Sequence, residues 1–256
     1  DMEFFKYQGT GNDFVIIDNR DGSVKLSQKQ VAYICDRRFG VGADGLILLQ
    51  DHSVLDFEMV YFNSDGNESS MCGNGGRCLI AFASSIGVFD KQCVFQAIDG
   101  KHEGKIDGSK VRLKMADINR IEKAENFYFM NTGSPHCVIF VEDVDQIDLK
   151  ARAHKVRYSD RFKKEGINVN FVAQKNANIR TYERGVENET LSCGTGATAC
   201  AIAMNLEDEF GYKNSCALKT KGGDLVVTYN RISEQEFTNI WLIGPAQFVY
   251  KGVINE

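Results

Sequence analysis

An internal repeat is the feature that most constrains how this chain can fold. Residues 67–75 read NESSMCGNG and residues 188–196 read NETLSCGTG, so two cysteines lie in the same setting, 193 − 72 = 121 positions apart. Weaker similarities at nearly the same spacing relate Thr10-Gly11-Asn12 to Thr132-Gly133-Ser134, and residues 40–44 to residues 166–170. Self-similarity of this kind indicates a duplicated structural unit. We therefore predict two homologous domains, residues 1–120 and 121–256.

Each half predicts the same local structure. A β-rich apolar segment (residues 56–62 and 178–182) leads through a polar loop and Cys-Gly-x-Gly into a helical stretch (residues 77–83 and 197–204). Both helical stretches are apolar on nearly every side, which is typical of a helix enclosed by protein. Short strands with Gly- and Asn-rich turns follow. The expected fold is α/β (α+β): two pseudo-symmetric domains, each with mixed or antiparallel strands wrapped around a central helix, and an active site in the interdomain cleft.

Composition excludes several classes of function. The 30 Lys and Arg against 35 Asp and Glu give a net charge of −5, which argues against a nucleic-acid or anionic-membrane partner. No apolar run approaches the roughly 18 residues of a membrane span. The first residues show neither the basic region nor the apolar stretch of a secretory signal. We therefore expect a cytoplasmic protein whose partner is a small molecule, and leave the oligomeric state open, with a homodimer as the candidate.

The eight cysteines do not predict a metal site. None lies at Cys-x2-Cys or Cys-x4-Cys spacing to another, and the four histidines do not cluster with them. In a reducing cytoplasm we expect free thiols rather than disulfides. Six should be small buried hydrophobic residues: Cys35, Cys78, Cys93, Cys137, Cys200 and Cys216. Cys72 and Cys193 are the candidate reactive pair, because both carry the repeated glycine pattern.

A cysteine at the start of a helix suits proton transfer. Unpaired N–H groups and the positive end of the helix dipole lower a thiol's pKa and attract anions, and glycines let the backbone approach a ligand. If a pseudo-twofold axis brings the halves together, one cysteine can take a proton from a carbon while the other delivers one to the opposite face. With no cofactor, backbone donors must stabilise the carbanion, at about 3–4 kcal/mol each. Such donors could come from Gly73, Asn74, Gly194 and Thr195.

Other functions fit the sequence less well. Residues 194–199 match the dinucleotide fingerprint G-x-G-x-x-A, but polar residues separate them from the preceding strand. A cysteine hydrolase using His136 would leave the duplication unexplained. The glycosylation sequons at 67–69 and 188–190 are coincidental without a secretory signal. The nearer alternative is a proline racemase-like isomerase on the same scaffold, which would have no use for an arginine that binds a distal carboxylate.

Five sequence strings carry a resemblance to a known family. They are KYQGTGNDFVIID, RRFGVGADGLI, NSDGNESSMCGNGGRC, TGSPHCV and YERGVENETLSCGTGATA. Together they strongly resemble diaminopimelate epimerase, and the match spans both halves. The resemblance implies an isomerase that interconverts LL- and meso-2,6-diaminopimelate by a two-base cysteine mechanism, without cofactor or metal, in lysine and peptidoglycan precursor biosynthesis.

The resemblance also implies roles for individual residues. Cys72 and Cys193 would be the acid/base pair, with Gly73, Asn74, Gly194 and Thr195 on the reacting α-carboxylate. Substrate, chiefly its distal end, would be held by Asn12, Asn63, Asn168 and Arg184. Glu183 would contact the substrate ammonium and tune one thiol, and His136 would lie beside the other. Two positions depart from the family pattern: Ser134 replaces a frequent Asn, which removes one distal contact, and Gly45 replaces an occasional Gln.

Overall fold

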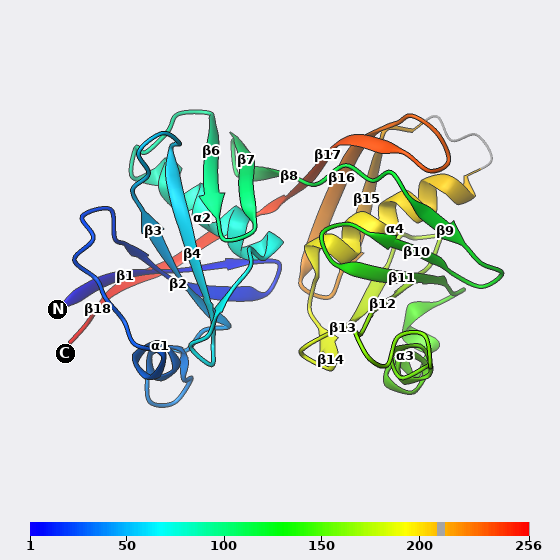
Figure 1. Cartoon of the computed structure of the whole chain (residues 1–256), viewed down its shortest axis with the longest axis horizontal. Coiled ribbons are helices and arrows are strands. Elements are labelled where there is room, and N and C mark those ends of the chain that lie inside the picture. Colours follow the sequence, from blue (N-terminus) through cyan, green and yellow to red (C-terminus); the bar gives the residue numbers. More distant parts are fainter. Residues whose placement is uncertain (209–212, 256) are drawn as a thin grey trace. The chain divides into compact units, whose positions relative to one another are not determined.

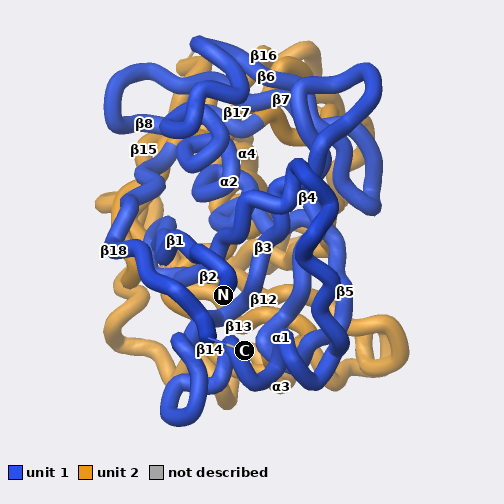
Figure 2. Tube along the Cα trace, turned by 90° about the vertical axis from the view of Figure 1, so that its left-hand side faces the viewer, with its two compact units in different colours: residues 1–113, 244–256 blue, residues 114–243 orange. Residues whose placement is uncertain are grey.

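The computed structural model describes residues 1–208 and 213–255, which form two compact units. Unit 1 comprises residues 1–113 together with 244–256, and unit 2 comprises residues 114–243. Figure 2 colours the chain by unit. Each unit has its own buried core, so each is described separately. Among the described residues, no helix has both the length and the apolar character needed to cross a lipid bilayer.

Unit 1 is built on one mixed sheet (Figure 1). Its strands run in the spatial order β8-β7-β6-β4-β3-β2-β1-β18, with β5 paired to β4. Most neighbours are antiparallel, but β2 pairs with β3 and β4 with β6 in parallel. The strands are β1 (Met2–Gly9), β2 (Asn12–Asp18), β3 (Gly45–Gln50), β4 (Phe57–Asn63), β5 (Glu68–Ser69), β6 (Gln92–Ala97), β7 (Gly100–Asp107), β8 (Lys110–Lys114) and β18 (Gln247–Ile254).

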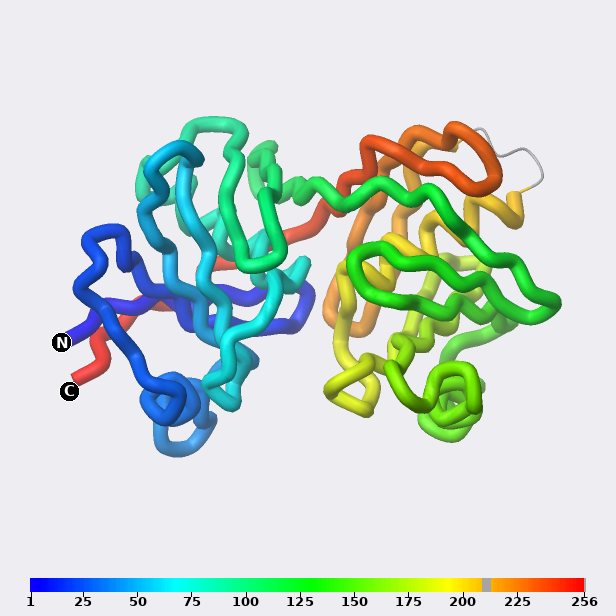
Figure 3. Tube along the Cα trace, in the orientation of Figure 1, coloured from blue at the N-terminus to red at the C-terminus, as the bar shows by residue number. Residues whose placement is uncertain are grey.

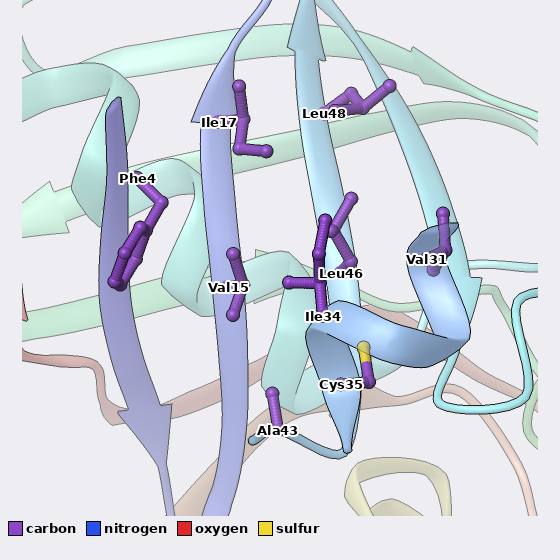
Figure 4. Close-up of a cluster of buried hydrophobic side chains, with 9 residues drawn as sticks. All are labelled: Phe4, Val15, Ile17, Val31, Ile34, Cys35, Ala43, Leu46 and Leu48. Atoms are coloured by element: carbon purple, nitrogen blue, oxygen red, sulfur yellow. The ribbon is translucent and has the colours of Figure 1, made fainter. Parts of the chain in front are cut away.

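Two helices cover the strands of unit 1. Helix α2 (Gly73–Ser85) is buried along most of its length and packs on β1, β2, β3 and β7, which makes it the central helix. Helix α1 (Gln28–Cys35) begins at a capping box formed by Ser27 and Gln30. Its apolar side covers β1 to β3 in a cluster shown in Figure 4: Phe4, Val15, Ile17, Val31, Ile34, Cys35, Ala43, Leu46 and Leu48.

Unit 2 repeats this design. A six-stranded sheet has the order β14-β13-β12-β11-β10-β9, and β15, β16 and β17 form an antiparallel run beside it. The strands are β9 (Ile121–Lys123), β10 (Tyr128–Asn131), β11 (Pro135–Phe140), β12 (Asn168–Val172), β13 (Ile179–Glu183), β14 (Asn188–Thr190), β15 (Ser215–Thr220), β16 (Gly223–Arg231) and β17 (Phe237–Pro245). The helices are η1 (Val144–Gln146), α3 (Leu149–Arg157) and α4 (Gly194–Glu207). Helix α4 is the central one, with nearly all of its residues buried.

The order of elements confirms the predicted duplication. In unit 1 the chain runs β1-β2-α1-β3-β4-β5-α2-β6-β7-β8, and in unit 2 it runs β10-β11-α3-β12-β13-β14-α4-β15-β16-β17. The parallel pair β2–β3 corresponds to the parallel pair β11–β12. Both helical stretches expected to be enclosed lie within α2 and α4. The predicted fold of strands around a central helix, repeated twice, is therefore correct.

The boundaries of the compact units differ from those of the two domains predicted from the sequence. Residues 244–256 lie with unit 1, because β18 pairs antiparallel with β1 from Met2↔Ile254 to Gln8↔Gln247. Figure 3 shows this red C-terminal strand beside the blue N-terminal one. The repeated order of elements ends at β8 and β17, so the repeat gives no signal for a strand that follows the second copy.

Candidate active site

Cys72 occupies the N-cap position of α2. Its backbone is extended (φ −94°, ψ 137°), and its carbonyl accepts the first helical hydrogen bond, donated by the Gly76 N–H at 2.7 Å. The backbone N–H groups of the helical residues that precede Gly76 have no acceptor within the helix. The first turn carries no acidic side chain that would cancel the positive end of the helix dipole. The thiol therefore lies where a negative charge is favoured.

Asn12 and Asn74 are joined in one hydrogen-bonded chain beside this cysteine. Asn74 Nδ2 donates to Asn12 Oδ1, and Asn12 Nδ2 donates to Asp44 Oδ2 at 2.9 Å. On the other side, Asn74 Oδ1 accepts from Thr10 Oγ1 and from Arg77 Nη2, each at 3.0 Å. Since each amide has a defined donor and acceptor side, both are fixed in orientation. Two of the three asparagines of unit 1 predicted to bind substrate are thus held rigidly together.

Cys193 repeats the arrangement at the start of α4. Its backbone is extended (φ −140°, ψ 117°), and its carbonyl accepts from the Ala197 N–H at 2.8 Å. Its Sγ lies 3.5 Å from Thr195 Oγ1, and that oxygen lies 2.7 Å from His136 Nε2. The structure therefore brings together three of the residues predicted for this half of the site.

The hydrogen bonds around His136 define its tautomer. Asn170 Nδ2 lies 2.9 Å from His136 Nδ1 and also donates to the Cys137 carbonyl, which can only accept. Because an amide nitrogen can only donate, His136 Nδ1 accepts and Nε2 carries the proton. His136 Nε2 then donates to Thr195 Oγ1, which leaves the Thr195 hydroxyl proton for the sulfur of Cys193. A donated O–H favours the thiolate form.

Close packing against α4 holds His136 and Asn170 in place. A Cβ at Gly196 would lie 2.5 Å from Asn170 Oδ1 and 3.2 Å from His136 Cε1. Only glycine therefore lets α4 approach the histidine and its supporting amide so closely. The second glycine of the Cys-Gly-x-Gly pattern is explained by this contact.

Burial keeps His136 neutral, and this predicts a pH-dependent stability. Burial, with a smaller contribution from the Arg184 charge, lowers the pKa of His136 to about 3, whereas in the unfolded chain it should titrate near its ordinary 6.5. The unfolded state then binds more protons between these values, so stability is complete above pH 6.5 and falls as the pH drops towards 3. The loss should approach about 1.4 kcal/mol per pH unit. Urea unfolding of wild type and of His136→Gln from pH 7 to pH 4 should show a smaller loss in the variant; parallel curves would contradict the assignment.

Asn168 braces the loop that carries Arg184. Its Nδ2 donates to Ser134 Oγ at 2.8 Å and to the Pro135 carbonyl at 2.9 Å, and its Oδ1 accepts from the Arg184 N–H at 2.7 Å. The hydroxyl of Ser134 thus accepts from Asn168, and its own proton points elsewhere. The Arg184 side chain is exposed, and its Nη1 donates to the carbonyl of Glu165 at 3.1 Å rather than to a carboxylate.

The remaining predicted site residues lie at strand ends. Asn63 ends β4, and its backbone closes the turn to Asn67 and Gly66. Glu183 ends β13 and precedes Arg184. Gly45 lies opposite Asn63 in the β3–β4 pair, where a Cβ would be 2.6 Å from the ring of Tyr61. A glutamine does not fit at position 45 while Tyr61 occupies this space, which accounts for that departure from the family pattern.

The environments of the eight free thiols predict which of them react. Burial raises the pKa of Cys35 and Cys216 to about 11 and that of Cys78, Cys93 and Cys137 to about 12, and it raises that of Cys200 well above 9. Cys72 and Cys193 are only partly buried and lie at helix starts. Iodoacetamide at pH 7.5 should therefore label these two first in the folded protein. Peptide mass spectrometry would measure this, and faster labelling of any of the other six would contradict it.

Four residues that support the half-sites were not predicted from the sequence: Thr10, Asp44, Arg77 and Asn170. Two of them could have been found from the sequence. Asp44 and Asn170 occupy the same position, the last one, in the similar segments 40–44 and 166–170. In each unit that residue binds a polar side chain beside the cysteine-bearing helix, Asn12 in one case and His136 in the other. Among the described residues, no group of three or more His, Cys, Asp or Glu could hold a metal ion.

Comparison with solved structures defines the class of fold. The chain resembles a PhzF-family phenazine biosynthesis protein from Bacillus anthracis, with a TM-score of 0.72 and 14% identity over 99% of each chain. It also resembles a probable proline racemase from Agrobacterium radiobacter K84, with a TM-score of 0.63 and 13% identity over 100% of this chain and 93% of that one. At such low identity the likeness shows the fold alone: this is a protein of the duplicated α/β fold found in PhzF proteins and proline racemases.

Sequence comparison defines the family within that class. Residues 4–121 and 128–249 match the diaminopimelate epimerase family. Diaminopimelate epimerase of Flavobacterium psychrophilum is 48% identical over 99% of this chain and 100% of its own length, and that of Chlorobaculum tepidum is 40% identical over 96% and 98%. The chain belongs to the diaminopimelate epimerase family, and it is an isomerase that acts on a small-molecule substrate.

Proposed function

We propose that the protein interconverts LL-2,6-diaminopimelate and meso-2,6-diaminopimelate by a two-base mechanism that needs no cofactor. The observation that carries the proposal is the duplicated half-site: a partly buried cysteine at the N-cap of a buried helix in each unit. The curated relatives, similar over nearly their whole length, are named diaminopimelate epimerase.

In the proposed reaction, one sulfur from each unit acts on a single α-carbon. The thiolate of one cysteine takes the α-proton, the electron pair of the C–H bond passes into the α-carboxylate, and the thiol of the other cysteine delivers a proton to the opposite face. The first cysteine ends as the thiol and the second as the thiolate. N–H groups of the first turns of α2 and α4, including those of Gly73, Asn74, Gly194 and Thr195, would stabilise the charge that develops on the carboxylate.

The distal end of the substrate would bind around Arg184. A guanidinium can hold a carboxylate through two parallel hydrogen bonds. The O–H of Ser134 can add a third donor, because Asn168 Nδ2 already donates to its oxygen. Ser134 would thereby replace the Asn contact that is frequent in the family. Asn12, Asn63, Asn168 and Glu183 complete the proposed binding set, with Glu183 and His136 tuning the thiols.

Substrate choice is the decisive test of this proposal. Circular dichroism with LL-diaminopimelate and with L-proline, at equal enzyme concentration, should show conversion of the former alone. Solvent deuterium should appear at the α-carbon of the product. Turnover of proline without turnover of diaminopimelate would overturn the substrate assignment in favour of the proline racemase-like alternative. That alternative is supported only by the shared fold. Size-exclusion chromatography of the same sample would test the homodimer.

The mechanism predicts inactivation by oxidation. Two thiols that share one small substrate can form a disulfide when the site is empty. Mild oxidation with diamide should therefore abolish activity, dithiothreitol should restore it, and saturating substrate should protect. Peptide mapping should find Cys72 linked to Cys193, and recovery of both as free thiols in the inactive protein would contradict the shared site. For the same reason we propose that the enzyme works in the cytoplasm, where thiols stay reduced.

A further inference from the structure

Arg77 is a buried cation in the helix that begins at Cys72. It lies in α2, and its side chain is completely excluded from solvent. Its guanidinium donates to four neutral acceptors: the Gly73 carbonyl at 3.4 Å, Asn74 Oδ1 at 3.0 Å, Thr10 Oγ1 at 3.1 Å and the Pro245 carbonyl at 3.3 Å. Within the part of the chain that the structure describes, no carboxylate forms an ion pair with it.

A buried guanidinium without a carboxylate is costly. Removing a charge from water is offset only by a counter-charge or by a full set of hydrogen bonds. Burial accordingly lowers the pKa of Arg77, and the groups that favour its charged form are the thiols of Cys78 and Cys72. Burial raises the pKa of Cys78 to about 12, so Cys78 is neutral near pH 7. Cys72 remains as the group that can supply the negative charge.

The local geometry holds the guanidinium at the first turn of α2, next to the residue that follows Cys72. Helical side chains lean towards the helix N-terminus, and Arg77 reaches back one turn to the carbonyl of Gly73, the residue that follows Cys72. A Cβ at Gly9 would lie 3.2 Å from the Asn74 carbonyl and 3.3 Å from Cys78 Sγ, so the glycine lets β1 approach α2 closely beside Arg77. Thr10, which accepts from Arg77, has a φ of +43°, a strained conformation for a β-branched residue. Several elements therefore hold Arg77 in this one position.

Apart from the exposed Lys101 of β7, the charged side chains on the elements around α2 have partners of their own. Lys6 of β1 pairs with Asp13 of β2, and Lys251 of β18 with Glu3 of β1. On β2, Asp18 pairs with Arg20, and near β7, His102 pairs with Asp99 and Asp107 with Arg112. Glu103 and Lys105 of β7 also have interactions, and burial raises the pKa of Tyr7. Strand β3, residues 45–50, carries no ionisable side chain.

We propose that Arg77 is a positioning residue whose buried positive charge stabilises the thiolate of Cys72. The role of Arg77 in epimerisation rests on the proposed function, whereas its stabilisation of the Cys72 thiolate does not. Arg77 also fixes the amide of Asn74, so one side chain supports both Cys72 and a donor for the carboxylate.

The test compares Arg77→Met and Arg77→Gln with Arg77→Lys, which keeps the charge. Arg20→Met is the matched control, because Arg20 lies in the same unit but is exposed and paired with Asp18. Each folded protein is alkylated with iodoacetamide from pH 5 to pH 10, and the Cys72 and Cys193 peptides are quantified by mass spectrometry. Thermal melting and steady-state kcat and KM are measured on the same preparations.

In the neutral variants we expect the midpoint of the Cys72 profile to rise by about 1–3 pH units, with kcat lowered, since that is the range for loss of a nearby opposite charge. The Cys193 profile should stay unchanged, and Arg77→Lys and Arg20→Met should resemble wild type. Thermal stability of Arg77→Met should be equal to or above that of wild type, because Met removes a buried charge.

Three results would overturn the inference: an unshifted Cys72 midpoint in a folded neutral variant, equal shifts at Cys72 and Cys193, or an Arg77→Lys profile like that of Arg77→Met. If the variants do not fold, wild type alone decides, because a Cys72 midpoint at or above that of free cysteine, about 8.5, is incompatible with a stabilised thiolate. Alkylation does not require turnover. Absence of epimerisation by wild type would therefore refute the proposed function while leaving this result intact.

Discussion

Replacing either Cys72 or Cys193 by serine is expected to lower kcat for epimerisation by about 10²–10⁴-fold, the usual contribution of a positioned acid or base. Serine keeps the shape of the side chain, but its hydroxyl is a far weaker acid than a thiol and cannot carry the proton at neutral pH. Circular dichroism with LL-diaminopimelate would follow the rate, and an unchanged melting temperature would show that the fold survives.

Further variants separate a shared mechanism from two independent defects. The double variant should be little slower than either single one, since residues that act as a unit are not additive. Cys216→Ser is the matched control: this thiol is also partly buried, but burial raises its pKa to about 11 and it lies in β15. Its activity should stay within about twofold of wild type. Near-normal epimerisation by Cys72→Ser or Cys193→Ser would end the two-base assignment.

The second large effect is expected at Arg184. Replacement by Met should lower kcat/KM for diaminopimelate by about 10²-fold, because two charge-assisted hydrogen bonds to the distal carboxylate are lost, at about 1.5–3 kcal/mol each with partial compensation by water. The loss should appear mainly in KM, since the distal carboxylate does not change charge during the reaction. Initial rates over a range of substrate concentrations would measure both parameters.

A substrate analogue sharpens the Arg184 prediction. An amino acid of the same length without the distal carboxylate should exchange its α-proton slowly, and equally so in wild type and Arg184→Met. Arg161→Met provides the control in unit 2, because Arg161 forms an exposed pair with Glu122 that contributes little. An equal loss of activity towards both substrates would show that Arg184 supports the reacting end instead of the distal one.

Much of the fold could be predicted because the repeat and the apolar patterns are local signals. The enclosed helices α2 and α4 were evident from their uninterrupted apolar residues, and the cysteines from their repeated glycines. The pairing of β18 with β1 was not predictable, because it joins residues more than 200 positions apart and follows the second copy of the repeat. Register over such a distance is set by packing and not by sequence pattern.

The candidate site was predicted unevenly for a similar reason. Asn12 and Asn74 are recognisable beside glycines in conspicuous motifs. Arg77 lies in the stretch predicted to be enclosed, but its complete burial and its hydrogen-bond partners could be known only from the structure. The role of Asn168 also needed the structure, since its amide is largely occupied by Ser134, Pro135 and Arg184. Hydrogen-bond partners across a fold leave no periodic trace in the sequence.

The return of the last strand to unit 1 has a consequence for biosynthesis. Residues 114–243 are continuous, so unit 2 can fold on the ribosome as soon as they emerge. Residues 1–113 of unit 1 are made before unit 2, yet the sheet of unit 1 lacks β18, and Arg77 lacks the Pro245 carbonyl, until residues 244–256 have been made. Unit 1 is therefore completed after unit 2. Until β18 pairs with β1, the edge of β1 is exposed, and pairing of this edge with another molecule must be avoided during synthesis.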